Sequence, residues 1–135
     1  MALITWTTAF SVGVREIDTQ HQELIRLIND LHDAMREGKG RSTMGEILKR
    51  LIDYTVNHFG FEEKLFAETG YPESLAHTAE HASLTREVQA LALKYESGQS
   101  VLSIEVMEFL RSWLTDHIKG VDKRYTAHLH SKGIR

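Results

Sequence analysis

Residues 44–65 read MGEILKRLIDYTVNHFGFEEKL, and this stretch decides the fold. Its apolar side chains recur at intervals of three and four, which is the period of an α-helix. The resulting stripe holds Met44, Ile47, Leu48, Leu51, Thr55 and Leu65. His58 and Glu62 continue the stripe, and residues four apart lie only about 40° apart around a helix. The sequence therefore predicts a helix whose core face carries a histidine and a carboxylate.

Three further stretches show the same period, and none alternates as a half-buried strand would. The chain contains a single proline, which suits long helices. We expect an all-α protein with short connections, and this favours an up-down-up-down antiparallel four-helix bundle. The expected helices span about 18–37, 43–68, 72–97 and 101–120, followed by a C-terminal extension.

Local signals predict where these helices begin. Asp18 is a favourable N-cap for the first helix. Thr43 and Glu46 have the spacing of a capping box for the second helix, and Pro72 suits the first turn of the third. Residues 1–17 are expected to form a non-helical arm, whose aromatic residues Trp6 and Phe10 should anchor it on the bundle.

The composition narrows the possible functions. The 135 residues have the length of one domain, so we expect a single domain over 1–135. The lack of cysteine excludes disulfides, thiolate metal sites and iron–sulfur clusters. The net charge of −3 and the scattered basic residues argue against nucleic acid as a partner. No apolar run approaches the roughly 20 residues that span a bilayer. We expect a monomeric, cytoplasmic protein without membrane insertion.

Eight histidines against five phenylalanines need an explanation. His77 and His81 share one helix face, while His21 and His117 fall on the core faces of the first and last helices. In an antiparallel bundle these positions, together with those of His58 and Glu62, meet near one end. At about 1.5 Å per residue, the residues of the first three helices lie within roughly 15 Å of that end. Scattered core histidines would have no reason to converge at one level.

Asp122 does not fit a regular helix. It follows His117 by five residues, and that spacing turns a side chain by about 140°. Gly120 lies between them, and glycine permits unusual backbone geometry. We expect the fourth helix to be distorted or to end there.

A lone inward histidine is more often a hydrogen-bonded core residue than a ligand. Buried Glu62 and Asp122, however, would cost several kcal/mol unless they were paired or bound to metal, and no lysine or arginine lies on the inner stripes. Seven side chains exceed the four ligands of a structural zinc site and indicate two metal ions. Nitrogen and oxygen ligands suit iron, manganese or zinc.

The remaining histidines are expected to take no part in this site. His32 lies roughly 16 Å further along the helix than His21. His128 and His130 are expected to be exposed in a C-terminal tail.

The ligand pattern resembles that of the hemerythrins, and most closely the bacterial single-domain kind. It consists of His21, His58-Phe-Gly-Phe-Glu62, His77-x-x-x-His81 and His117-x-x-x-x-Asp122. The resemblance extends from Trp6 through Ile17-Asp18-x-Gln20-His21, Tyr71-Pro72 and Trp113-Leu114.

This resemblance implies a non-haem di-iron centre that binds dioxygen reversibly. His77, His81 and His117 would bind one iron, and His21 and His58 the other. Glu62, Asp122 and an oxo or hydroxo oxygen would bridge the two irons. The implied oxygen pocket is apolar and consists of Leu24, Phe59, Trp113, Leu114 and Ile118.

Three functions remain possible at this point. The first is an oxygen carrier or store, which is not an enzyme and which could deliver oxygen to an oxygen-using enzyme. The second is an oxygen or redox sensing module, although these residues include no output domain. The third is a di-iron oxidase, a ferroxidase or an iron store. Such sites are usually rich in glutamate with Glu-x-x-His pairs, which this chain lacks.

Overall fold

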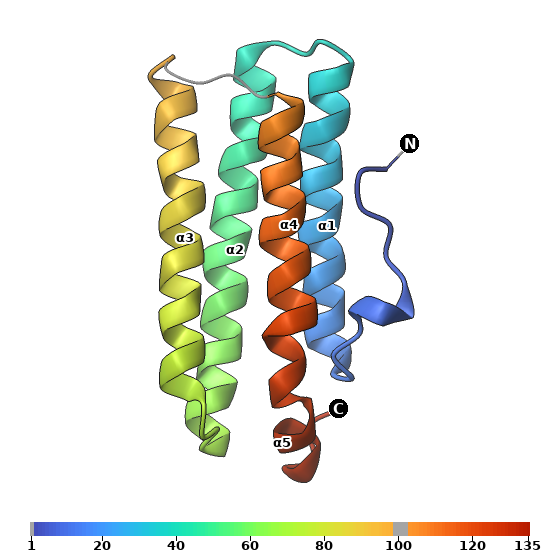
Figure 1. Ribbon diagram of the computed structural model, residues 1–135, viewed down its shortest axis with the longest axis vertical. Helices are drawn as coiled ribbons and strands as arrows, with labels where there is room; N and C mark the ends of the chain where they lie inside the picture. The colour runs from blue at the N-terminus through green and yellow to red at the C-terminus, as the bar shows by residue number, and fades with distance from the viewer. Residues whose placement is uncertain (1, 99–102) are drawn as a thin grey trace.

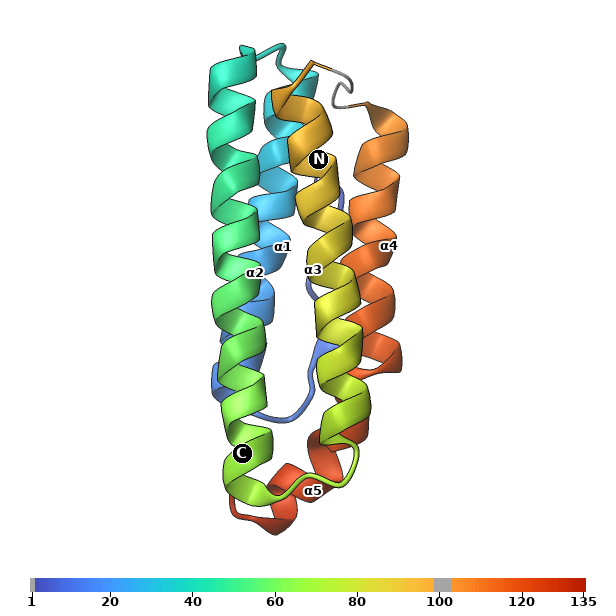
Figure 2. The same ribbon diagram turned by 90° about the vertical axis from the view of Figure 1, so that its left-hand side faces the viewer.

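The computed structural model describes residues 2–98 and 103–135. Four long helices run alternately up and down, so that neighbours in sequence are antiparallel (Figures 1 and 2). They are α1 (Arg15–Arg36), α2 (Arg41–Thr69), α3 (Ser74–Glu96) and α4 (Ile104–Gly120). Short elements flank them, namely η1 (Thr8–Phe10), η2 (Asp122–Tyr125) and α5 (Thr126–Ser131). No strand occurs within the described ranges, and the predicted all-α four-helix bundle is confirmed.

Each long helix contributes fully buried apolar side chains to the core. Leu31 of α1, Leu51 of α2, Val88 of α3 and Leu110 of α4 have no exposed surface. Burying one such side chain stabilises a fold by about 1.5–3 kcal/mol. Among the described residues, no helix combines the length and the apolar character needed to cross a membrane.

The predicted start of the first helix at Asp18 is wrong. Helix α1 begins at Arg15, and its N-cap, Val14, makes no side-chain cap. The Asp18 carboxylate instead accepts hydrogen bonds from Ser11 Oγ at 2.6 Å and from the Val12 amide at 2.8 Å. Asp18 has the residue type of an N-cap, but its hydrogen bonds connect the arm to the first turn of the helix.

The starts of α2 and α3 also differ from the prediction. Helix α2 begins at Arg41, before the predicted capping box, and its guanidinium lies 4.3 Å from the centre of the Tyr95 ring. The Tyr95 hydroxyl also donates to the Arg41 carbonyl at 3.0 Å, so contacts with α3 hold Arg41 at this boundary. Helix α3 begins at Ser74, whose amide donates to the Tyr71 carbonyl, so that Pro72 belongs to the preceding turn. The predicted start of the fourth helix at residue 101 lies outside the described residues.

The N-terminal arm packs along the bundle (Figure 1) and ends at Val14. It contains the single turn η1, so it is not wholly non-helical as predicted. The rings of Trp6 and Phe10 stack 5.7 Å apart, and Phe10 is buried. Asn29 of α1 pairs with the backbone of Ile4 through two hydrogen bonds of 2.9 Å. The expected anchoring by aromatic side chains is confirmed.

The predicted break after His117 is also confirmed. Helix α4 ends at Gly120, Val121 has φ −111° and ψ −51°, and the chain continues as the 3₁₀ turn η2. The break does not depend on the special freedom of glycine, because Gly120 is not among the glycines with positive φ.

We therefore expect Gly120→Ala to be tolerated and to stabilise the protein by up to about 1 kcal/mol, because a Cβ there would meet nothing within 4 Å. Gly13→Ala is the matched contrast. Gly13 has φ +74°, and a Cβ would lie 3.0 Å from the His130 ring, so we expect a loss of about 1–2 kcal/mol. Urea unfolding of both variants measures the difference. A destabilised Gly120→Ala protein would show that the break does need glycine.

Candidate metal centre

All seven predicted ligands lie at the end of the bundle where η2 and α5 cap it. His21 comes from α1, His58 and Glu62 from α2, His77 and His81 from α3, His117 from α4 and Asp122 from η2. None is more than 4% exposed. One other polar residue in the described ranges is buried, Thr55, and its hydroxyl donates to the Leu51 carbonyl. The other buried polar side chains thus all belong to this cluster.

The imidazole Nε2 atoms face the two carboxylates. Asp122 Oδ1 lies 3.0 Å from Nε2 of His77 and 2.9 Å from Nε2 of His117. The other oxygen of Asp122 lies 3.0 Å from Nε2 of His21. Glu62 Oε1 lies 3.0 Å from Nε2 of His81 and 3.6 Å from Nε2 of His58.

The donor atoms divide into two groups, within each of which all donors lie within 4.8 Å of one another. One group has three histidines and the other has two. The members are His77, His81, His117, Glu62 and Asp122 in the first, and His21, His58, Glu62 and Asp122 in the second. Because Glu62 and Asp122 belong to both groups, the geometry suits two adjacent cations that share both carboxylates.

The cluster fits metal ions better than it fits a closed hydrogen-bond network. Buried atoms without a hydrogen-bond partner include Nε2 of His21, His58, His81 and His117, Glu62 Oε1 and Asp122 Oδ2. Each such atom costs about 1–3 kcal/mol if nothing compensates it. Imidazole nitrogen and carboxylate oxygen are ligands for iron, manganese and zinc. The cluster is therefore able to bind metal.

The charge states suit this role. Burial raises the pKa of Asp122, but His117, His21 and His77 outweigh it, so the pKa lies well below its ordinary value. The pKa of Glu62 is also lowered, because the histidines around it outweigh burial and the nearby Asp122. Burial lowers the pKa of His58 to about 4. The carboxylates are thus ionised at neutral pH, and the His58 imidazole is neutral with a free lone pair.

Comparisons with known proteins agree with this geometry. The family described as Hemerythrin HHE cation binding domain matches residues 12–129. The chain belongs to the hemerythrin family. It is 37% identical over 134 residues to bacteriohemerythrin of Stenotrophomonas maltophilia, covering 96% of this chain and 86% of the relative. It is 40% identical to bacteriohemerythrin of Methylococcus capsulatus, covering 93% of this chain and 95% of the relative.

A solved structure has the same fold. The crystal structure of a wild-type hemerythrin superposes with a TM-score of 0.89 at 40% sequence identity. The match covers 95% of this chain and 98% of that chain. The family model and the fold therefore support the same assignment.

Two polar contacts that the sequence did not predict orient histidines of the metal-binding cluster. His58 Nδ1 lies 2.6 Å from Gln20 Oε1, and His81 Nδ1 lies 2.9 Å from Glu63 Oε2. Each oxygen accepts the Nδ1 proton, which leaves the Nε2 lone pair directed at the carboxylates. The sequence offered one indication of these contacts, because Gln20 and Glu63 are each adjacent in sequence to a predicted ligand, His21 and Glu62.

Tyr125 makes a third contact that the sequence did not predict. Its buried hydroxyl donates to Glu62 Oε2, and its ring lies 5.6 Å from the His77 ring at an angle of 25°. Burial first, and then Asp122 and Glu62, raise the pKa of Tyr125 well above its ordinary value. The hydroxyl therefore stays protonated and fixes one oxygen of Glu62.

We expect Tyr125→Phe to lower the free energy of unfolding of the metal-free protein by about 1–3 kcal/mol, because Glu62 Oε2 loses its donor while remaining buried. Urea unfolding of the metal-free protein measures the change. Tyr54→Phe is the control, since Tyr54 is only partly buried. Equal losses in the two variants would contradict a special role for Tyr125.

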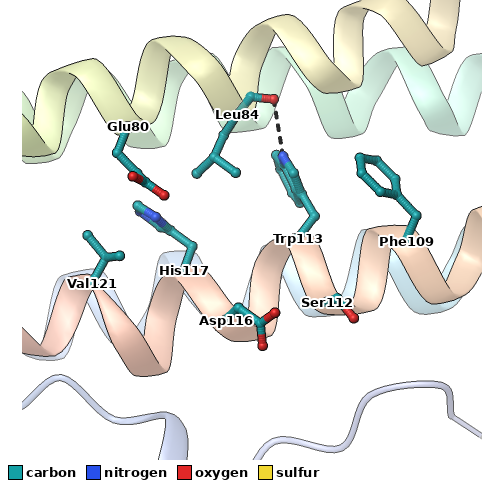
Figure 3. A pocket seen from close by; sticks show the side chains of 8 residues that line it. All are labelled: Glu80, Leu84, Phe109, Ser112, Trp113, Asp116, His117 and Val121. Atoms are coloured by element: carbon teal, nitrogen blue, oxygen red, sulfur yellow. Dashed lines mark hydrogen bonds between the residues drawn. The ribbon is translucent and has the colours of Figure 1, made fainter.

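The five residues predicted to line an oxygen pocket are all buried. Leu24, Phe59, Trp113, Leu114 and Ile118 are at most 6% exposed. The Phe59 ring stacks on the His81 ring, with centroids 3.8 Å apart and planes 5° apart. Trp113 Nε1 donates to the Leu84 carbonyl (Figure 3). These positions agree with an apolar wall, and the binding of oxygen there stays a prediction.

The other histidines lie outside both donor groups. His32 does so as predicted, but the expected exposure of His128 and His130 is wrong. Both are half-buried, because α5 packs back onto the bundle. His128 Nε2 lies 3.0 Å from the Thr69 carbonyl, and His130 Nε2 lies 2.7 Å from the Gly13 carbonyl.

Proposed function

We propose that this protein binds dioxygen reversibly at a pair of iron ions and acts as an oxygen carrier or store, or delivers oxygen to an oxygen-using enzyme. His77, His81 and His117 would hold one ion and His21 and His58 the other, with Glu62 and Asp122 shared. The observation that supports this most is the unequal division of donors. The position with two histidines has one protein ligand fewer, which leaves room for a small exogenous ligand.

When bound, two ferrous ions would supply a Lewis-acidic site and the electrons that dioxygen needs for binding. The chain itself supplies orientation and shielding. Gln20 and Glu63 fix the tautomers of His58 and His81, and Tyr125 fixes Glu62. The apolar wall of Leu24, Phe59, Trp113, Leu114 and Ile118 excludes water and carries no acid that could protonate the ligand, and both properties favour reversible binding.

The donor set favours a carrier over an oxidase or a ferroxidase. Five histidines and two carboxylates converge here, whereas oxidase sites in helical bundles are rich in glutamate. This balance supports a role that is not enzymatic.

Reconstitution with ferrous iron tests the proposal. We expect two iron ions per chain by elemental analysis and an optical spectrum that cycles through repeated oxygenation and deoxygenation. One ion per chain would contradict the shared-carboxylate site. Irreversible oxidation with turnover of a reductant would contradict the carrier function.

We expect Leu114→Ala to speed decay of the oxygenated protein about tenfold or more, because a shortened side chain in the apolar wall admits water. Leu114 is buried, and Leu93, which is 66% exposed on α3, gives the matched Leu→Ala control. Decay is followed optically after oxygenation. Equal rates in Leu114→Ala and Leu93→Ala would show that Leu114 does not shield the site.

A further inference from the structure

A pocket of about 390 Å³ opens between α3 and α4 and reaches the candidate metal centre (Figure 3). Leu84, Phe109 and Trp113 form apolar parts of its lining, and His117 also lines it. The His117 side chain is buried, its Nε2 faces Asp122 Oδ1 at 2.9 Å, and its Nδ1 has no hydrogen-bond partner. The pocket therefore connects solvent with one histidine of the centre.

Two carboxylates mark this pocket. Glu80 on α3 and Asp116 on α4 both line it, and both are exposed. Figure 3 shows Glu80 pointing from α3 toward the His117 ring, whereas the Asp116 side chain, next to His117 on α4, points away from α3. The pocket lining contains no lysine or arginine. Within the described part of the chain, no salt bridge involves Glu80 or Asp116.

Two other pockets also reach histidines of the centre, but each carries an arginine. The pocket beside His81 is lined by Arg86 as well as by Glu63, which is already paired with His81 Nδ1. The pocket beside His77 is lined by Arg124, and Glu80 forms part of its wall. Arg86 offsets the charge of Glu63 in the first of these pockets, and Arg124 offsets one of the two glutamates, Glu73 and Glu80, that line the second. Of the three openings, the one at His117 offers a cation the most favourable charge.

We propose that the pocket between α3 and α4 is the entry route for the divalent metal ions, with Glu80 as the first protein ligand that an incoming ion meets. Asp116 raises the local cation concentration, and His117 is the first residue of the centre that the ion reaches. Because the two acids are exposed, their attraction for a cation is strongest at low ionic strength. This inference rests on the proposed function only in requiring that the centre binds metal.

An entry site has a kinetic signature that a structural role lacks. By detailed balance, a transient ligand that does not hold the bound ion lowers the barrier for uptake and for release equally. Its removal slows both rates by the same factor and leaves the equilibrium affinity unchanged. If Glu80 served only to position His117, its removal would weaken the affinity and speed release instead.

The experiment uses the metal-free full chain and Co²⁺ as the probe, mixed by stopped flow. Trp6→Phe is introduced as a background, so that quenching of Trp113 fluorescence reports arrival of the ion. We expect Glu80→Gln with Asp116→Asn to slow uptake about tenfold at low ionic strength, and less at high salt. At high salt, where long-range attraction to the bound ion is screened, release to a chelator should slow by the same factor as uptake, and the Co²⁺ affinity should change little.

Glu46→Gln with Asp53→Asn is the matched control. It removes the same charge from exposed acids on α2, away from the pocket, and should leave both rates unchanged. Circular dichroism confirms that all variants are folded. Uptake that is unchanged in the Glu80 and Asp116 variant, or slowed equally by the control, would overturn the entry route. Faster release with weaker affinity at high salt would also overturn it. Failure of the unsubstituted protein to bind any Co²⁺ would instead count against the proposed function.

Discussion

Asp122→Ala is expected to weaken the binding of both metal ions by at least about a hundredfold, since removing even an outer partner of a metal ligand costs about 10–100-fold. The two oxygens of Asp122 lie about 3 Å from Nε2 of three histidines, and the residue belongs to both donor groups. Among the described residues, no other carboxylate belongs to either donor group except Glu62, which already serves both. Anaerobic titration of the metal-free variant, with metal counted per chain after dialysis, measures the loss.

Asp53→Ala provides the control for this substitution, because Asp53 is an exposed aspartate on α2. It should retain two ions per chain. Glu62→Ala should resemble Asp122→Ala, since Glu62 is the other shared carboxylate. Retention of one tightly bound ion by Asp122→Ala would show that Asp122 belongs to a single metal position.

Phe59→Ala should lower the free energy of unfolding by about 3–5 kcal/mol, which is the usual cost of emptying a buried aromatic site. The Phe59 ring covers one face of His81 and lies 5.7 Å from the His117 ring. The substitution thus removes core packing and the support of two histidines together. Urea unfolding of the metal-free protein gives the energy.

Phe109→Ala is the matched control for Phe59→Ala. Phe109 is 40% exposed on α4, so its removal should cost much less than that of Phe59. Comparable losses would mean that the stack on His81 adds no stability beyond that of a surface aromatic residue.

The sequence carried enough information to predict the bundle and the convergence of the seven residues. Helical period places His58 with Glu62 and His77 with His81, and antiparallel packing brings the ends of successive helices to one level. Even the break before Asp122 could be predicted, because a spacing of five cannot face one point in a regular helix. These features follow from helical periodicity, which does not depend on the rotamers of individual side chains.

The predictions were wrong where a residue that suggests a local role makes a tertiary contact instead. Asp18 has the residue type of an N-cap, but its carboxylate binds the arm instead. His128 lies near the C-terminus, where an exposed tail was expected. Helix α5 folds back instead, and His128 Nε2 lies 3.0 Å from the Thr69 carbonyl. Helix propensity and capping preferences describe isolated segments. The contacts of Asp18 and His128 depend on how the arm and α5 pack against the bundle.

The contacts that support the centre could not be predicted for a different reason. The bonds of Gln20, Glu63 and Tyr125 depend on side-chain rotamers and on the path of the chain through η2. Tyr125 lies three residues after Asp122, but its direction is set by a 3₁₀ turn whose extent periodicity does not give. Such contacts are determined only by the three-dimensional structure.

The cluster lies at one end of the bundle and takes donors from all four long helices, so metal bound there would couple the stability of the fold to metal occupancy. Two ions that share Glu62 and Asp122 would together act as a clasp across the four helices, one joining α2, α3 and α4 and the other joining α1 and α2. The opposite end has no such clasp among the described residues, so unfolding of the loaded protein should begin there. Metal loading would then prolong the half-life of the native state mainly by slowing its unfolding.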